Sequence, residues 1–178
     1  SLLLTVVAMP LGAALAPAQL STIGQFSGDM FEGFESQAGG PCITPDAFGG
    51  SALLCSVGGT VNVSTGWSFL CTIQPAGGNE FVGGTSGALS FTFFDPVRRF
   101  GGWFGTNGSQ GVVTVRFFDD QMLLIGSEVA DVTADCGWYW NGWESDEPVY
   151  AIEIENSVHS GCHVMLDELE AISFFGPG

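Results

Sequence analysis

Residues 112–119 read Val-Val-Thr-Val-Arg-Phe-Phe-Asp, and residues 150–155 read Tyr-Ala-Ile-Glu-Ile-Glu. In the first stretch, apolar side chains occupy alternate positions at Val113, Val115 and Phe117. The second stretch has the same two-residue period, with acidic side chains at two of the positions between its apolar ones. Successive side chains of a β-strand point to opposite faces of the sheet. Each stretch therefore predicts a strand with one buried face and one wet face, as in antiparallel sheets.

The rest of the chain repeats this pattern in shorter runs. β-Branched and aromatic residues recur between turn signals rich in Gly, Asn, Asp and Pro, and helical periodicity is almost absent. We therefore predict an all-β fold, an antiparallel jelly-roll-like β-sandwich. The other predicted strands span residues 52–57, 67–73, 88–94, 98–104, 122–125, 138–143, 163–166 and 170–175.

The first eighteen residues differ in character from the remainder. Residues 2–18 are uncharged and mostly apolar and end in Ala-Pro-Ala, like the apolar region and cleavage site of a secretory signal. We predict that residues 1–18 are a signal peptide whose start is truncated, and that the mature protein is extracellular. The remaining 178 − 18 = 160 residues suit one domain. In it, residues 19–29 are predicted as a polar lead-in and residues 30–178 as the sandwich.

The charge of the chain is strongly one-sided. It has 19 acidic residues, three Arg and no Lys, for a formal net charge of −16 at pH 7. Nucleic acids and anionic membranes are bound through clusters of Lys and Arg, so neither is expected as a partner. Divalent cations and neutral polymers stay open as partners. The acidity is equally explained by solubility alone.

Five cysteines in an exported chain favour disulfides over thiolate metal sites. Leaving one cysteine free and pairing the other four allows 5 × 3 = 15 arrangements, so the sequence does not determine the pairing. Our preferred bridges are Cys42–Cys55 and Cys136–Cys162. Cys71 is then the odd thiol, buried on a strand.

Several segments resemble secreted bacterial β-sandwich proteins of the kind that often carry a PEP-CTERM sorting tail. They are residues 89–104, Leu-Ser-Phe-Thr-Phe-Phe-Asp-Pro-Val-Arg-Arg-Phe-Gly-Gly-Trp-Phe, residues 112–119, and residues 142–148, Gly-Trp-Glu-Ser-Asp-Glu-Pro. The terminal strand around residues 166–169, Leu-Asp-Glu-Leu, continues the same order of elements. The resemblance covers roughly residues 30 to 175 and lies in pattern more than identity.

Phe31-Glu32-Gly33 and Leu166-Asp-Glu-Leu169 also resemble the terminal motifs of calcium-stabilised jelly-roll carbohydrate-binding modules. In those modules the Glu and the Asp are calcium ligands. The resemblance implies Glu32 and Asp167 as ligands of a structural Ca²⁺, with Asp29 or Glu168 beside them. Carboxylates and carbonyls are the oxygen ligands that this ion takes. The alternative is that these acids are ordinary residues flanking strands.

A cluster of aromatic and polar residues is the predicted ligand surface. Its members are Trp138, Trp140, Asn141, Trp143 and Glu144, whose rings could stack on sugars while the amide and carboxylate bond hydroxyls. Strand alternation separates the first two from Asn141 and Trp143. At least one of the two faces should therefore be core.

These observations predict a secreted, non-catalytic β-sandwich module that binds extracellular polysaccharide or matrix. The first alternative is a structural cell-surface protein that associates with itself through strand edges and takes no small ligand. The second is a glycoside hydrolase with a carboxylate pair, which no motif in the chain supports. The oligomeric state and the identity of any ligand are left open.

Overall fold

The chain folds almost entirely into β-strands. The computed structural model describes residues 19–84, 87–108, 112–156 and 163–176. Every strand pairing within those ranges is antiparallel, and the strands pack as a sandwich, so the predicted fold class is confirmed. The predicted signal peptide, residues 1–18, lies outside the described residues.

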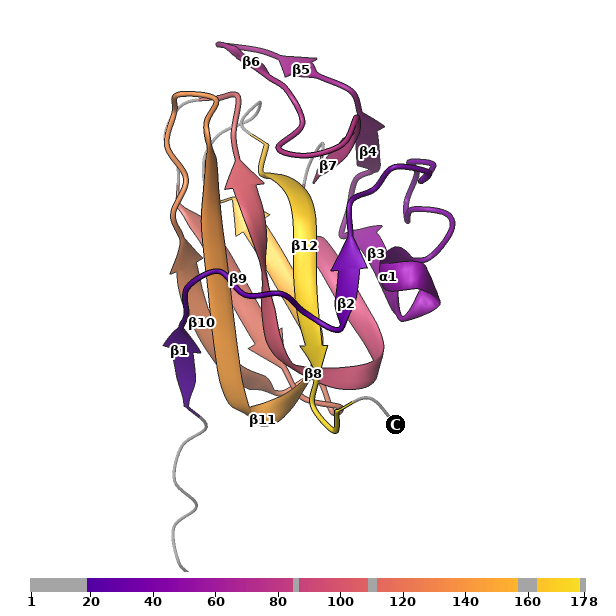
Figure 1. The fold of residues 1–178 in the computed structure, drawn as a ribbon, viewed down its shortest axis with the longest axis vertical. Coiled ribbons are helices and arrows are strands. Elements are labelled where there is room, and N and C mark those ends of the chain that lie inside the picture. Colours follow the sequence, from indigo (N-terminus) through magenta and orange to yellow (C-terminus); the bar gives the residue numbers. More distant parts are fainter. Residues whose placement is uncertain (1–18, 85–86, 109–111, 157–162, 177–178) are drawn as a thin grey trace, which may run out of the picture.

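Two long strands, β8 (Leu89–Gly105) and β11 (Trp138–Asn156), belong to both layers of the sandwich. They pair with each other along nearly their whole lengths. Their register shifts on both sides of Val149, next to Pro148. Bulges bend a strand and let it pass from one sheet to another. Figure 1 shows the strong curve of β8 near one end of the molecule.

The first layer uses the beginning of β8 and the end of β11. There β3 (Ala52–Ser56) pairs with β8, and β9 (Val113–Phe118) pairs with β11. The edge strand β10 (Leu124–Ala130) pairs with β9. The order across this layer is therefore β3, β8, β11, β9 and β10.

The second layer uses the other halves of the two long strands. The last strand, β12 (Met165–Ser173), pairs with β8, and β1 (Leu20–Thr22) pairs with β11. Two further strands, β2 (Met30–Glu32) and β7 (Phe81–Gly84), pair with different parts of β12. The strand β4 (Val61–Ser64) pairs with β7. The first and last strands of the sandwich domain thus lie side by side (Figure 1).

The core lies between these layers. Phe91 and Phe100, from the two halves of β8, face each other with ring centroids 5.4 Å apart. Phe117 of the first layer meets Trp143 of the second at 5.8 Å. Aromatic pairs at this separation bury large areas and add specific contact energy. The largest fully buried side chains are Trp143, Phe34, Phe81, Phe91, Phe100, Phe104 and Phe117.

Two small elements lie outside the layers. The strands β5 (Trp67–Ser68) and β6 (Thr72–Ile73) form a hairpin at one end of the molecule, at the top of Figure 1. The segment α1 (Ala47–Gly50) is a compact turn more than a helix, because Phe48 and Gly49 have φ angles of 54° and 64°. It packs beside β2 and β3.

The structure differs from the predicted strands in several ways. Three pairs of predicted strands are each one continuous strand, because the residues at a bend in a strand resemble a turn between two strands. The pairs are residues 88–94 with 98–104, 138–143 with 150–154, and 163–166 with 170–175. The predicted strand over residues 67–73 is instead the β5–β6 hairpin. The predicted lead-in, residues 19–29, contributes strand β1.

Two disulfides are present among the described residues. Cys42 is bonded to Cys55, as expected, and Cys71 is bonded to Cys136. The predicted Cys136–Cys162 bridge is therefore wrong, and Cys162 lies outside the described residues. The physical reason is a small apolar cluster of Ile73, Phe81 and Met165, which holds the β5–β6 hairpin against the turn that carries Cys136.

The two bridges are typical of extracellular proteins. In the described part of the chain, no helix is both long and apolar enough to cross a membrane.

The two disulfides should differ in their contribution to stability. Cys42–Cys55 closes a separation of 13 residues and Cys71–Cys136 one of 65. Chain-entropy arguments assign about 3 kcal/mol to the shorter loop and about 4 kcal/mol to the longer one. We expect the Cys71→Ala/Cys136→Ala variant to lose more free energy of unfolding than Cys42→Ala/Cys55→Ala in urea titrations. Peptide mapping that links Cys136 to Cys162 would contradict this assignment.

Candidate functional site

A groove of about 600 Å³ opens beside β2. One wall is the segment that runs from Phe31 to Gln37, and the other runs from Pro45 to Gly50. The first wall continues β2 beyond its pairing with β12, and the second is the α1 turn. A volume of this size falls in the range of small-ligand sites.

The buried carboxylate of Glu32 holds the two walls together. Its Oε1 accepts a hydrogen bond from the N–H of Phe34 at 2.7 Å, and its Oε2 accepts one from the N–H of Phe48 at 2.7 Å. The amide of Gln37 also donates to Oε2, at 3.0 Å. Phe34 and Phe48 both have positive φ, a conformation that few non-glycine residues adopt. Hydrogen bonds to a charged acceptor help to stabilise that backbone.

An aromatic ring lies on the groove. Phe31 is 54% exposed. A Cβ added to Gly33 would come 3.2 Å from Phe31 Cε1, so the glycine lets the ring lie close to the backbone. The ring therefore offers an exposed apolar face at the mouth of the groove.

Polar groups complete the lining. The carboxylate of Asp46 makes no capping hydrogen bond to the turn that follows it. The Oε1 atom of Gln37 is buried and has no hydrogen-bond partner. An unpaired buried acceptor is costly, and a buried water is the kind of donor that satisfies such an atom. Glu35 and Ser36 line the same groove.

Asp167, near the C-terminal end of the chain, does not line the groove but contacts a separate loop. Asp167 is fully buried, and its Oδ2 accepts hydrogen bonds from the N–H groups of Ala76 at 2.7 Å and Gly77 at 3.1 Å. Glu35 Oε1 accepts one from the N–H of Asn79 at 2.6 Å. Carboxylates from both ends of the domain thus converge on one loop, residues 76–80, and hold it by backbone hydrogen bonds.

The pKa values of Asp167 and Glu35 are shifted in opposite directions. Burial raises the pKa of Asp167 to about 6, and its three backbone hydrogen bonds lower the value only in part. Hydrogen bonds from Asn79 lower the pKa of the exposed Glu35. Loss of solvation is thus the main cause of the raised pKa of Asp167, whereas hydrogen-bond donors are the main cause of the lowered pKa of Glu35.

The predicted calcium ligands do not form a calcium-like shell in this arrangement. Calcium takes roughly six to eight oxygen ligands. In the described part of the chain, no three His, Cys, Asp or Glu residues gather as a metal-binding group. N–H groups point at the carboxylates of Glu32, Asp167 and Asp29, and Glu168 packs against Gly77. Glu32, Asp167 and Asp29 thus each have hydrogen-bond donors within the protein, and calcium stays a prediction from the resemblance.

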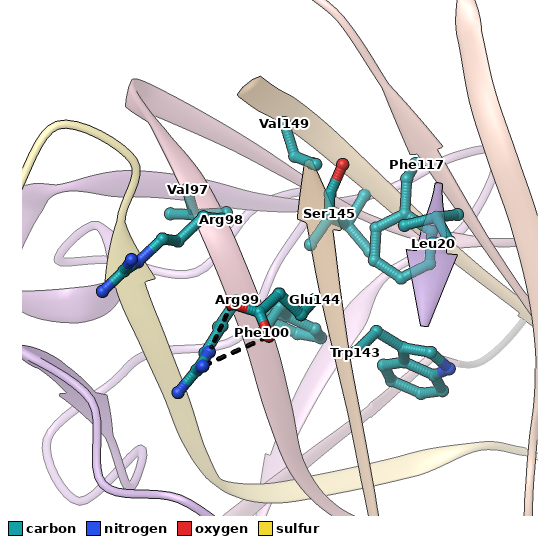
Figure 2. Close-up of a pocket in the computed structure, with 11 residues that line it drawn as sticks. Leu20, Val97, Arg98, Arg99, Phe100, Phe117, Trp143, Glu144, Ser145 and Val149 are labelled. Atoms are coloured by element: carbon teal, nitrogen blue, oxygen red, sulfur yellow. Dashed lines mark hydrogen bonds and ion pairs between the residues drawn. The ribbon is translucent and has the colours of Figure 1, made fainter. Parts of the chain in front are cut away.

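The predicted aromatic ligand surface is largely packed. Trp143 is in the core, and the amide of the buried Asn141 bonds to the backbone of Asp131 through both of its polar atoms. Glu144 forms an ion pair with Arg99 at 2.9 Å (Figure 2). Asn141 and Trp143 are therefore packed on the inner face, as strand alternation allowed, whereas Glu144 lies on the opposite face with Arg99 as its partner.

The two remaining tryptophans are half-buried on the outer face of the second layer. Trp138 donates its indole N–H to the carbonyl of Gln74 at 2.7 Å and packs on Phe81. Trp140 meets Phe26 and Trp103 edge to face. Both rings thus contact other side chains or the backbone of the protein itself.

A second space lies at the bend of β8 and β11, lined by residues that include Leu20, Phe117 and Trp143 (Figure 2). It leaves no room for a water molecule. It is therefore a feature of packing between the layers, not a binding site.

Sequence reasoning identified Glu32 but missed the groove that it builds. Phe31 belongs to the Phe31-Glu32-Gly33 motif, but the motif predicts a ligand role only for Glu32. No sequence motif marks Asp46 or Gln37 as a binding residue. Their place beside Phe31 depends on the hydrogen bonds of Glu32 to Gln37 and to the α1 turn. The double glycine at residues 49–50 predicts a turn but does not indicate that the turn forms one wall of a groove.

No family model matches the chain, and no curated protein matches it. Among solved structures, a family 6 carbohydrate-binding module from Clostridium cellulolyticum in complex with xylose is similar at 19% identity and a TM-score of 0.37; the match covers 62% of this chain and 88% of that one. A family 29 carbohydrate-binding module matches at 11% identity and 0.38, covering 88% and 90%. The enzymatically active domain of tailspike protein 4 from bacteriophage CBA120 matches at 16% and 0.29, covering 88% and 20%. At scores this low, we base no functional argument on these likenesses.

The buried Asp167 should make stability depend on pH. Its pKa in the folded protein is raised above the ordinary 3.8, so its contribution is fully present below pH 3.8 and is lost as pH rises through about 6. The cost of ionising it at neutral pH is about 2 to 3 kcal/mol. We expect the free energy of unfolding of Asp167→Asn, relative to wild type, to improve by that amount between pH 3.5 and pH 7.5. Parallel profiles for the two proteins would contradict the raised pKa.

Proposed function

We propose that this protein is a secreted, non-catalytic module that binds extracellular polysaccharide or matrix polymer in the groove between Phe31 and Gly50. The observation that supports this proposal is the groove itself, which presents an exposed aromatic ring together with the carboxylate of Asp46, which makes no capping hydrogen bond. Sugar rings have apolar faces that stack on aromatic side chains and hydroxyls that bond to amides and carboxylates. The site therefore differs from the strand that the sequence favoured.

A binding role accounts for the groove better than hydrolysis does. Glycoside hydrolysis needs two carboxyl groups facing one bond from opposite sides. In this protein Asp167 lies outside the groove, and the carboxylates of Glu32 and Glu35 already accept three hydrogen bonds each, which leaves Asp46 as the groove carboxylate without a capping bond. The acidic residues at the two chain ends therefore act in holding loops, which supports the non-catalytic reading.

Removing the exposed ring tests the proposed site. Phe31→Ala should weaken binding of a glycan by at least about tenfold, because the apolar contact with the sugar face is lost. Calorimetry against a panel of soluble polysaccharides would identify the ligand and measure the loss. Phe94→Ala is a matched control, since Phe94 is also 54% exposed but lies on β8 outside the groove. An equal loss in both variants, or no binding by any polymer, would overturn the proposal.

A structural calcium ion is the second element of the proposal, and it rests on the motif resemblance alone. It predicts that calcium raises the melting temperature over that in chelator, since an ion bound only by the folded state stabilises that state. Asp167→Asn should abolish the rise, and magnesium is the control ion. Identical melting curves in calcium and in chelator would leave hydrogen bonding as the whole role of Asp167.

A further inference from the structure

The free polar atoms of the groove are hydrogen-bond acceptors. The Gln37 amide nitrogen already donates to Glu32 at 3.0 Å, and its unpaired Oε1 is shielded from solvent, so this side chain offers no donor to a ligand. Asp46 adds a carboxylate without a capping bond. An ionised carboxylate only accepts hydrogen bonds. A ligand that fits these atoms must therefore supply donors.

No positive charge balances the acidic residues of the groove. Glu32, Glu35 and Asp46 all line it, and no Arg or His does. The chain has no Lys and only three Arg, two of which are held in ion pairs, Arg99 with Glu144 and Arg116 with Glu155. The third, Arg98, lines the small space at the β8–β11 bend instead. Clefts lined by one sign of charge concentrate ligands of the opposite sign and repel those of the same sign.

The ring of Phe31 suits the same kind of ligand. An ammonium group over an aromatic face is attracted by the partial negative charge of the π-electrons on that face, and nearby carboxylates add to the attraction. Phe31 and Asp46 belong to opposite walls, so a group in the groove would have the ring on one side and the carboxylate on the other. Neutral sugars gain the stacking contact but not the charge interaction.

We propose that the groove recognises a glycan through the primary ammonium group of an amino sugar, with Phe31 and Asp46 as its contacts. This inference rests on the proposed function, because it names the class of sugar that the groove takes. It also predicts which glycans the groove rejects. An acylated amino sugar loses the charge and a sugar acid carries the wrong one, so both should bind more weakly.

The test compares oligosaccharides that differ only at the nitrogen. Calorimetry with a glucosamine oligomer should show binding at least about tenfold tighter than with the N-acetylated oligomer of the same length. Asp46→Asn should remove most of this difference. Asp120→Asn, an exposed acidic residue in the turn between β9 and β10, should preserve it and controls for net charge. A uronic acid oligomer and tetralysine complete the panel.

The outcomes separate this inference from the function on which it rests. Equal affinities for the amino and acetylated oligomers, unchanged by Asp46→Asn, would overturn the amino-sugar assignment and leave glycan binding intact. No binding by any oligosaccharide would overturn both. Tetralysine binding that matches the glucosamine oligomer and also depends on Asp46 would assign the groove to peptide amines, against a glycan ligand.

Discussion

The antiparallel pairing of β8 with β11 is the constraint on which the rest of this protein depends. Because both strands run through both layers, every other strand of the sandwich joins one of them directly or through a neighbour. The bend near Val97 and Val149 sets how the layers face each other and brings Phe91 onto Phe100. A residue inserted in either strand would turn its side chains to the opposite face and expose the core.

Buried carboxylates supply the second level of organisation. Taking a carboxylate out of water is costly unless donors replace the lost solvation. Glu32 accepts backbone N–H donors from the α1 turn, whereas the donors from residues 76 and 77 replace the lost solvation of Asp167 only in part, so the pKa of its carboxyl stays raised. Each hydrogen bond fixes a loop as well as satisfying the acid, so the α1 turn and residues 76–80 acquire defined positions. The groove has its second wall because the hydrogen bond from the N–H of Phe48 to Glu32 holds the α1 turn beside β2.

The candidate site could be predicted from the sequence only in part, and the tryptophans explain why. The strand carrying Trp138 to Glu144 has the composition of a sugar-binding surface, but Trp143 fills the core and Trp138 is bonded to a loop. Aromatic residues on strands serve packing more often than recognition, and sequence spacing does not distinguish the two. Conversely, Asp46 and Gln37 look like ordinary loop residues until the turn places them beside Phe31.

By itself, the sequence determined the all-β class, the alternating strands, the acidic balance and the importance of Glu32 and Asp167. These properties follow from local periodicity and composition, which do not depend on distant contacts. Only the tertiary structure decided that Cys136 meets Cys71, that the two acids bond different loops, and that an open groove lies beside Phe31. Those features depend on which segments become neighbours, and that choice is made by packing across the bend of β8 and β11.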